Sequence, residues 1–163
     1  MNPNMSPIDW AKRPIQKFAD LNGRAPRAEF WWWVLAIVVA SIVTRIIDNI
    51  LGMKIVGAYG PLSLILSVAL IVPNIAVSVR RLHDTDRTGW WILLPIVPYC
   101  IAFVLGGSAM LSGSMTGLGT AGIFLLIGAV CALVLLVYYV MPGSPGSNRY
   151  GPNPYEGGSV AAA

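Results

Sequence analysis

NIAVSVRRLHDTDRTGWW, which spans Asn74 to Trp91, is the stretch that decides the fold. It ends one long apolar run and begins the next with two tryptophans. Between these runs lie three arginines, two aspartates and the only histidine of the chain. Such a concentration of charge between two apolar segments is typical of a hairpin that joins two membrane-spanning helices at the bilayer surface. We expect this hairpin over residues 80–89.

The composition of the whole chain agrees with this interpretation. Of its 163 residues, 56% are hydrophobic and only 11% are charged, and the mean hydropathy is +0.68. A soluble fold could not cover so much apolar surface with so few charges, since soluble domains carry roughly a quarter charged residues. The net charge of +4 does not indicate nucleic-acid binding, because the basic residues lie beside apolar runs. We expect an integral membrane protein embedded in the lipid bilayer.

Four apolar runs approach or exceed the roughly 20 residues that a helix needs to cross a bilayer. They cover about residues 30–51, 61–82, 89–111 and 121–141. The predicted fold class is all-α: a polytopic membrane protein with a four-helix transmembrane bundle. The uncharged, glycine-rich stretch over residues 106–120 is expected to be a flexible linker.

The two cysteines, Cys100 and Cys131, fall inside these apolar runs. We interpret them as unpaired core residues. The chain has no cluster of cysteines and histidines of the kind that holds structural zinc. We therefore expect no metal site and no cofactor.

The N-terminal segment, residues 1–29, precedes the first span. Within it, Ser6 to Leu21 places apolar side chains on one half of a helical wheel and charged ones on the other, as in a helix that lies on the membrane surface. Ser6 is the predicted N-cap and Pro7 the first helical residue. Pro14 is expected to kink or split this helix. The alternative is a partly disordered basic tail.

The first and second spans carry polar side chains that need partners. Arg45 and Asp48 are three residues apart, so they either pair on one face or Arg45 extends to the bilayer surface. Along the second span runs a polar stripe that we expect to face the bundle, with the candidate residues Ser67, Asn74 and Ser78.

Proline in the second span leaves a gap in the helical hydrogen bonding. Pro73 frees the carbonyl near Ala69, and the side chain of Asn74 could replace the missing bond. The alternative is that Pro73 and Asn74 mark a broken helix with a solute site at mid-membrane.

The basic residues indicate the orientation. Five lie before or at the start of the first span, three in the charged hairpin and one in the tail, whereas only Arg45 and Lys54 lie at the opposite surface. Basic residues are concentrated on the cytoplasmic side of membrane proteins. We therefore expect both termini and the hairpin in the cytoplasm. The tail, residues 142–163, is rich in turn formers, and Ser159 to Ala163 are expected to be disordered.

This orientation brings three polar segments to one surface, where they can touch. Asp84 lies four residues after Arg80 and three after Arg81, a spacing that allows pairing on a helix, and Glu29 is the other carboxylate near these arginines. Such a cluster could lock the bundle or could bind a ligand. Its candidate residues are Arg24, Arg27, Glu29, Arg80, Arg81, His83, Asp84, Arg87, Asn148, Arg149 and Tyr150.

Three sequence blocks carry a family resemblance. GRAPRAEFWWW from Gly23, SVRRLHDTDRTGWW from Ser78 and GSNRYGPNPY from Gly146, in this order between apolar runs, resemble the motifs of the domain of unknown function 805 family. The resemblance covers roughly residues 18–155. It implies a four-helix protein of the bacterial inner membrane with no established enzymatic activity, and it provides no catalytic residues.

The second block departs from the family pattern at two positions. Where such sequences usually read RRLHDTGRSGWW, this chain has Asp86 for the glycine and Thr88 for the serine. Asp86 adds a carboxylate to the hairpin and removes backbone freedom. We therefore do not expect the tight turn that a glycine would allow, nor a close phosphate contact there.

Three function classes remain in view. We expect a non-enzymatic membrane protein whose arginine-rich cluster binds a partner protein or anionic lipid headgroups, because arginine forks suit phosphate. The alternative is a small-solute transporter or channel subunit that uses the polar stripe on the second span. The third is an enzyme at the membrane surface with His83 as general base, oriented by Asp84 or Asp86. The chain carries no nucleophile motif or phosphate loop to accompany His83, so we expect no enzyme. The sequence leaves the oligomeric state open.

Overall fold

The computed structural model describes residues 5–55, 57 and 59–155, so the tail residues Ser159 to Ala163 lie outside the described part of the chain. All regular elements in the described residues are helical, which confirms the all-α fold class. In chain order they are α1 (Pro7–Gln16), α2 (Arg27–Ile50), α3 (Pro61–Ala69), α4 (Ile71–Asp84), the short 3-10 helix η1 (Gly89–Ile92), α5 (Leu93–Ser112) and α6 (Met115–Val140).

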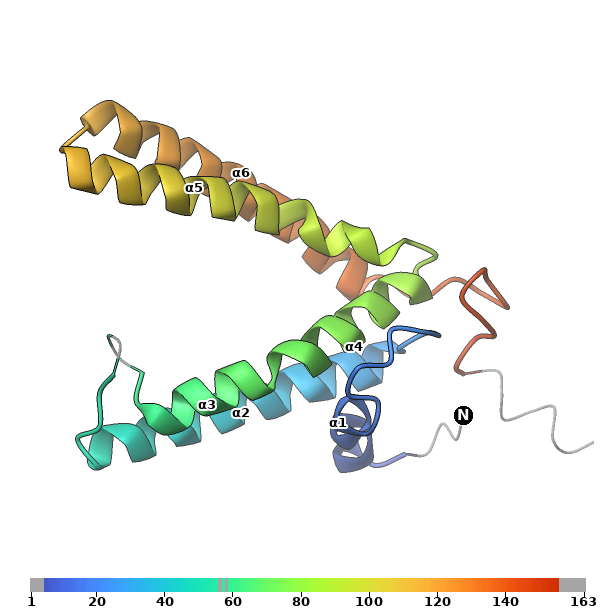
Figure 1. Cartoon of the computed structure of the whole chain (residues 1–163). Helices are drawn as coiled ribbons and strands as arrows, with labels where there is room; N and C mark the ends of the chain where they lie inside the picture. The colour runs from blue at the N-terminus through green and yellow to red at the C-terminus, as the bar shows by residue number, and fades with distance from the viewer. Residues whose placement is uncertain (1–4, 56, 58, 156–163) are drawn as a thin grey trace, which may run out of the picture.

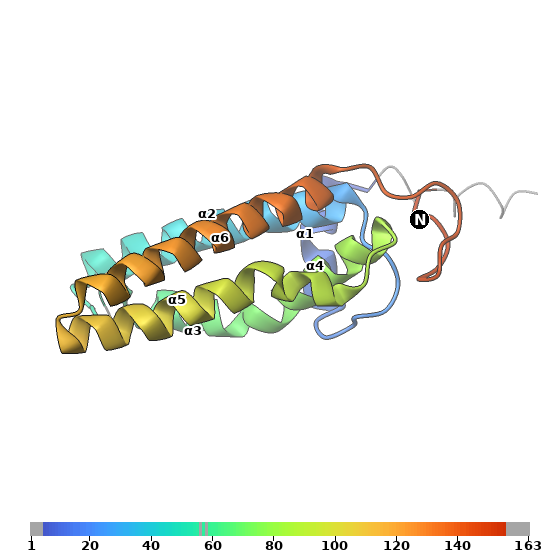
Figure 2. The same cartoon turned by 90° about the horizontal axis from the view of Figure 1, so that it is seen from above.

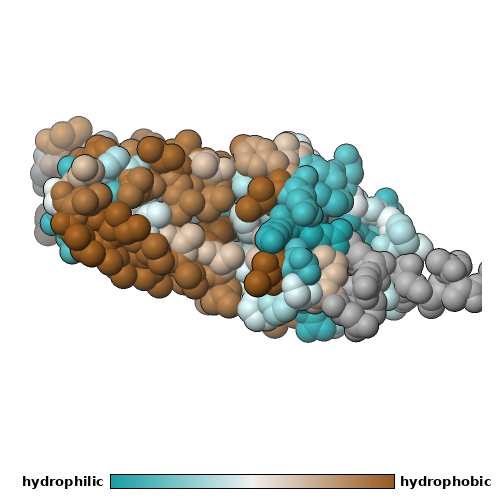
Figure 3. Space-filling view, turned by 90° about the horizontal axis from the view of Figure 1, so that it is seen from below, coloured by the Kyte–Doolittle hydropathy of each residue, from teal (hydrophilic) through white to brown (hydrophobic). Residues whose placement is uncertain are grey.

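Four of the resulting segments are long and apolar enough to cross a membrane, as predicted. They are α2, α3 together with α4, η1 together with α5, and α6. In Figure 3, apolar side chains cover much of the helical length, and hydrophilic residues gather at one end of the molecule. The protein is therefore a polytopic membrane protein with one strongly polar end.

The four spans form two hairpins that meet at the polar end. One hairpin consists of α2 with α3 and α4, and the other of α5 with α6; they converge where α1 and the C-terminal loop lie and diverge toward the opposite end (Figure 1). Figure 2 shows the same hairpins from above, with α6 running over α2. A ring contact between Phe30 and Tyr139, with centroids 4.5 Å apart, joins them near the polar end. The bundle is thus open at one end.

Helix α1 begins as predicted. The Ser6 side chain accepts a hydrogen bond from the Asp9 backbone N–H at 3.2 Å, and Pro7 is the first helical residue. The helix continues through Pro14 without splitting and ends at Gln16, earlier than expected. Because Pro14 lies within the last turn, only a few residues of helix follow it. Trp10 and Pro14 are buried, whereas Ile8 and Ile15 are exposed, so α1 packs across the polar end by part of its apolar face.

The second span is interrupted where Pro73 was expected to weaken it. Helix α3 ends at Ala69 and α4 begins at Ile71. The expected replacement bond from Asn74 to the Ala69 carbonyl is not what the structure shows. Instead, the Asn74 amide oxygen accepts a hydrogen bond from the indole N–H of Trp33, on α2, at 3.0 Å. The side chain of Asn74, close to the break, thus hydrogen-bonds the neighbouring helix α2.

The polar stripe on this span is only partly covered by its neighbours. The Ser67 hydroxyl donates to the carbonyl of Ser63 at 2.7 Å, and the Ser78 side chain lies beside Tyr139 of α6. Ser67 and Asn74 remain exposed. They share a helical face with Ser78, so their exposure follows from the divergence of the two hairpins beyond Tyr139 (Figure 1).

At the end opposite α1, Asp48 organises the turn between α2 and α3. Its carboxylate accepts hydrogen bonds from the backbone N–H groups of Leu62 at 3.1 Å and Ser63 at 2.8 Å, at the start of α3. These N–H groups have no partner within the helix. The guanidinium of Arg45 instead donates to the hydroxyl of Tyr59 at 2.6 Å. The structure thus shows no pair between Arg45 and Asp48, and the aspartate serves as a helix cap.

The predicted flexible linker over residues 106–120 is wrong. Helix α5 extends to Ser112, α6 begins at Met115, and only Gly113 and Ser114 lie between them. Glycine here allows close packing, since a methyl group at Gly117 would lie 2.7 Å from the Ala109 side chain of α5. In lipid no water can hydrogen-bond an irregular backbone, so a helix is favoured even in a glycine-rich segment.

Gly128 on α6 offers a test of this packing. A methyl group there would lie 2.7 Å from the ring of Tyr99 on α5, and overpacking a tight contact typically costs about 1–3 kcal/mol. We expect Gly128→Ala to lower the free energy of unfolding in detergent by this amount. Gly119→Ala is the matched control, because nothing lies within 4 Å of its added methyl, and it should be neutral or stabilising by up to about 1 kcal/mol. Equal effects of the two changes would contradict the packing described here.

Candidate functional site

The polar end of the molecule is organised around the carboxylate of Asp84, at the C-terminal end of α4. Asp84 is 2% exposed. One carboxylate oxygen accepts a hydrogen bond from Nε of Arg24 at 2.9 Å, and the other pairs with Arg81. Arg24 comes from the loop before α2, whereas Arg81 lies one turn earlier on α4. Of the two arginines whose spacing allowed pairing with Asp84, Arg81 is thus the one that does so.

Arg81 also connects the two hairpins. Its Nε donates to the backbone carbonyl of Tyr139 at 3.1 Å, and Nη2 donates to the carbonyl of Met141. These carbonyls lie at the C-terminal end of α6, where backbone oxygens have no partner within the helix. A cation at this end is also favoured by the helix dipole. Arg81 therefore joins the C-terminal end of α4 to that of α6.

Arg24 holds the C-terminal loop against α4. Its guanidinium donates to the backbone carbonyls of Ser144 and Gly146, both at 2.7 Å. The Ser144 N–H in turn donates to the carbonyl of Asp84 at 2.8 Å. Gly143 contacts the Asp84 carboxylate so closely that a methyl group on it would overlap the oxygens. The loop is thus fixed by hydrogen bonds from both its backbone and its arginine partner.

A second buried pair lies beside the first. Nη1 of Arg80 donates to Glu29 on α2 at 2.5 Å, and both side chains are almost fully buried. The other Glu29 oxygen lies 3.6 Å from Nε of Arg13 on α1. Nε and Nη2 of Arg80 are buried without a hydrogen-bond partner in the described part of the chain. We call the five buried residues Arg24, Glu29, Arg80, Arg81 and Asp84 the arginine node.

The arginine node has three guanidinium groups against two carboxylates, all with little contact with solvent. Removing charges from water is costly, and attraction between partners repays this cost only when the geometry is good. In the node, Asp84 meets two arginines and Arg24 finds several backbone carbonyls. The node therefore fixes the relative positions of α2, α4, α6 and the C-terminal loop.

His83 lies beside the node but has no carboxylate partner among the described residues. Its ring stacks on Tyr150, with centroids 3.7 Å apart and planes 3° apart, and Nδ1 lies 3.3 Å from the carbonyl of Gly23. Asp84 is occupied by Arg24 and Arg81, and Asp86 by Arg149. Neither aspartate therefore orients His83, as a catalytic role for this histidine would need.

The tail residues Asn148 and Arg149 close the contact between the C-terminal loop and the hairpin. The Asn148 amide donates to the carbonyl of His83 at 2.9 Å. Nε of Arg149 lies 3.1 Å from the Asp86 carboxylate, with both side chains about half exposed. The three sequence blocks that contain Arg24, His83 and Asn148 are therefore in direct contact.

Asp86 corrects an expectation about the hairpin turn. It has a φ of 58°, in the left-handed region, so the tight turn exists although the glycine is replaced. Its N–H donates to the carbonyl of His83 at 3.0 Å, and the next N–H, of Arg87, donates to Leu82 at 3.0 Å. Aspartate tolerates this conformation better than most residues because its short polar side chain can hydrogen-bond locally. The turn therefore survives the substitution.

Arg27 and Arg87 are predicted cluster members that lie outside the node. Arg27 is exposed and donates to the Val140 carbonyl at 3.3 Å. The Arg87 guanidinium lies over the ring of Tyr138, 3.9 Å from its centroid. Neither has a carboxylate partner in the described residues, and the same holds for the exposed Lys12 on α1. We call Lys12, Arg27 and Arg87 the basic rim.

The stripe residues Ser67 and Asn74 are not part of this site, and Ser78 lies beside Tyr139 at its edge. Sequence reasoning missed Arg13, which joins Glu29, and Gly143, which contacts Asp84. The position of Arg13 on the polar half of α1 was the available signal. For Gly143 there was none, because it lies in an ordinary turn-forming sequence. No group of three potential metal ligands occurs within the described ranges.

The pair of Glu29 and Arg80 provides a test of the node. Glu29→Gln leaves the buried Arg80 without its partner, and Arg80→Met leaves Glu29 with the longer, 3.6 Å contact to Arg13. We expect each change to lower the free energy of unfolding in mixed micelles by about 3–5 kcal/mol. The double variant removes both charges. We expect it to be less destabilised than the sum of the single variants, with a coupling energy of about 1–3 kcal/mol.

The exposed pair of Asp86 and Arg149 is the control for this cycle. Asp86→Asn and Arg149→Gln remove the same charges at the surface, and Asn tolerates the left-handed conformation. Their coupling energy should stay below about 1 kcal/mol. Equal coupling at both pairs would show that the burial of the node does not set its strength.

Comparisons with known proteins agree with the resemblance found in the sequence. A family model described as a protein of unknown function (DUF805) matches residues 18–152. Inner membrane protein YhaH of Escherichia coli K12 is 29% identical over 147 residues, which cover 90% of this chain and 97% of that protein. Inner membrane protein YhaI of the same organism is 31% identical over 147 residues, with coverage of 90% and 96%. No solved structure matches. The chain therefore belongs to the DUF805 family of proteins of unknown function.

Proposed function

We propose that the protein is a non-enzymatic component of the bacterial inner membrane whose basic rim binds anionic lipid headgroups. The relatives YhaH and YhaI are named inner membrane proteins, and the four apolar spans are compatible with the same location. Both termini and the basic rim face the cytoplasm in this proposal. The excess of basic residues at the polar end supports this orientation, because such residues are concentrated on the cytoplasmic side.

The observation that carries the proposal is the difference between two groups of cations at the polar end. Arg24, Arg80 and Arg81 are buried and paired with carboxylates, so their role is to hold the polar end together. Lys12, Arg27 and Arg87 keep their charge at the surface without a carboxylate partner in the described residues. A lipid phosphate can neutralise this charge.

The surroundings of Arg87 favour a lipid over a soluble partner. Its guanidinium lies over the rings of Trp91 and Tyr138, at 5.0 and 3.9 Å from their centroids. Aromatic side chains at the ends of membrane spans lie at the depth of the lipid headgroups. A cation held among them is therefore at the depth of the phosphates.

Lipid retention by the purified protein tests this proposal. We expect native mass spectrometry to show phosphatidylglycerol bound to the wild type. A triple variant with Lys12→Gln, Arg27→Gln and Arg87→Gln should bind this lipid about ten- to hundredfold more weakly, because each cation near an anionic surface contributes about 1 kcal/mol. The double control Lys17→Gln and Arg149→Gln removes cations that already pair with carboxylates, and it is compared with the double variant Arg27→Gln and Arg87→Gln, which removes the same charge. Equal losses in both double variants would contradict a specific role of the basic rim.

Cysteine labelling tests the orientation independently. In a variant with Cys100 and Cys131 replaced by alanine, a cysteine introduced by Arg149→Cys should react with a membrane-impermeant maleimide only after the cells are permeabilised. Labelling of intact cells from outside would place the polar end on the other side and would contradict the cytoplasmic rim.

A further inference from the structure

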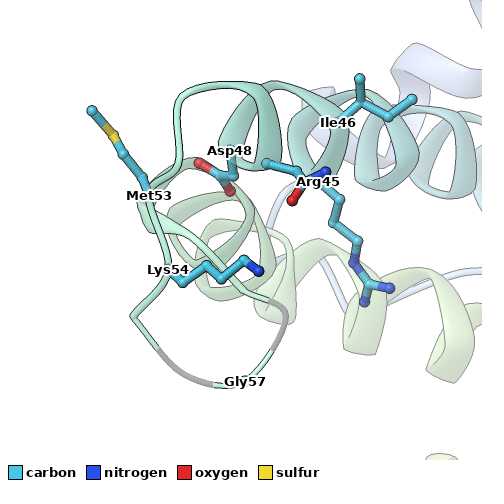
Figure 4. Close-up of a pocket in the computed structure, with 7 residues that line it drawn as sticks. Arg45, Ile46, Asp48, Met53, Lys54 and Gly57 are labelled. Carbon is cyan, nitrogen blue, oxygen red and sulfur yellow. The ribbon is translucent and has the colours of Figure 1, made fainter.

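A second polar feature lies at the end of the molecule far from the arginine node. A hollow of about 400 Å³ opens there between the last turns of α2 and the loop that leads to α3. Its lining includes Arg45, Ile46, Asn49, Met53 and Lys54. Figure 4 shows Arg45 reaching toward it from α2 and Lys54 from the loop. Nothing in the proposed function of the basic rim involves these residues.

The hollow carries a positive charge that the protein does not neutralise. Lys54 is exposed, and no ion pair or hydrogen bond of its ammonium occurs in the described part of the chain. Arg45 lies over the ring of Tyr59, 4.5 Å from its centroid, and donates from Nη2 to the Tyr59 hydroxyl. A guanidinium has five N–H donors, so most of its hydrogen-bonding capacity remains.

The one carboxylate in the lining does not cancel these charges. Asp48 is 1% exposed, and its two oxygens accept hydrogen bonds from the N–H groups of Leu62 and Ser63. The start of α3 carries partial positive charge from its unpaired N–H groups, which the Asp48 carboxylate balances. Asp48 therefore does not neutralise the positive charges of Arg45 and Lys54 in the hollow.

The walls and surroundings of the hollow also include apolar side chains. Ile46 and Met53 line it, and the nearby Ile50 and Ile55 are 76% and 59% exposed. In a membrane protein such side chains at the end of a span contact lipid, so a ligand here lies at the boundary between acyl chains and headgroups. A cation pair beside exposed apolar side chains fits an amphiphile with an anionic head.

We propose that this hollow binds the phosphodiester headgroup of an anionic phospholipid in the leaflet at this end of the molecule. The Arg45 guanidinium and the Lys54 ammonium donate to the phosphate oxygens, and the acyl chains run along Ile46. Arginine suits the planar arrangement of two phosphate oxygens, and lysine adds a point charge. Two basic residues on the side opposite the main excess of basic charge are otherwise disfavoured, and phosphate binding gives them a role.

Hydrogen exchange of the full-length protein in nanodiscs tests this site by position. With phosphatidylglycerol in place of phosphatidylcholine, we expect backbone amides of residues 45–55 to exchange at least threefold more slowly. Lys54→Gln should abolish this protection without unfolding the protein, because Lys54 has no partner within the described residues. Lys12→Gln, which removes the same charge at the opposite end, should leave it unchanged.

The outcomes separate this site from the basic rim and from a free anion. Protection of residues 45–55 that survives Lys54→Gln, or that is equal in both lipids, would overturn the proposal. A further arm adds 10 mM inorganic phosphate to phosphatidylcholine nanodiscs, about the concentration at which a weak anion site fills. Equal protection in this arm would show a site for free phosphate and would also overturn the lipid proposal. Loss of lipid binding at the rim alone would leave residues 45–55 protected, so the two proposals fail independently.

Discussion

The carboxylate of Asp84 is the group on which the arrangement of the polar end depends. It lies at the end of α4, almost without solvent contact, and it accepts from Arg24 and pairs with Arg81. A buried carboxylate is stable as an anion only when donors surround it. Each of its partners also holds backbone carbonyls, Arg81 at the end of α6 and Arg24 in the C-terminal loop. One charged group thus determines where segments far apart in the sequence lie.

This arrangement fits the physics of a membrane protein. Lipid chains are as apolar as leucine, so apolar side chains alone give helices little reason to associate. The contact within the α5–α6 hairpin relies on small residues such as Gly117 and Gly128 that allow close approach. Between the hairpins, ring packing of Phe30 on Tyr139 and the hydrogen bonds of Arg81 join the polar end, and away from it the hairpins diverge (Figure 1).

Much of the fold and part of the site could be predicted from the sequence. The apolar runs indicated four spans, Ser6 and Pro7 indicated the start of α1, and the spacing of Arg81 and Asp84 indicated their pair. The glycine-rich stretch around Gly117 misled, because the same composition gives a flexible linker in water and a tightly packed helix in lipid. The turn at Asp86 was not expected because the loss of glycine was taken to exclude it, although aspartate also tolerates the left-handed conformation.

Backbone hydrogen exchange in the wild type and in Asp84→Leu is the most direct test of the central claim. The Ala25 N–H donates to the Arg80 carbonyl and the Ser144 N–H to the Asp84 carbonyl, so both amides report on the polar end from different segments. If Asp84 holds these segments together, the variant should lose protection at both amides at once, while amides in the middle of α6 near Gly128 remain protected. Retained protection at Ala25 and Ser144 in the variant would contradict the account.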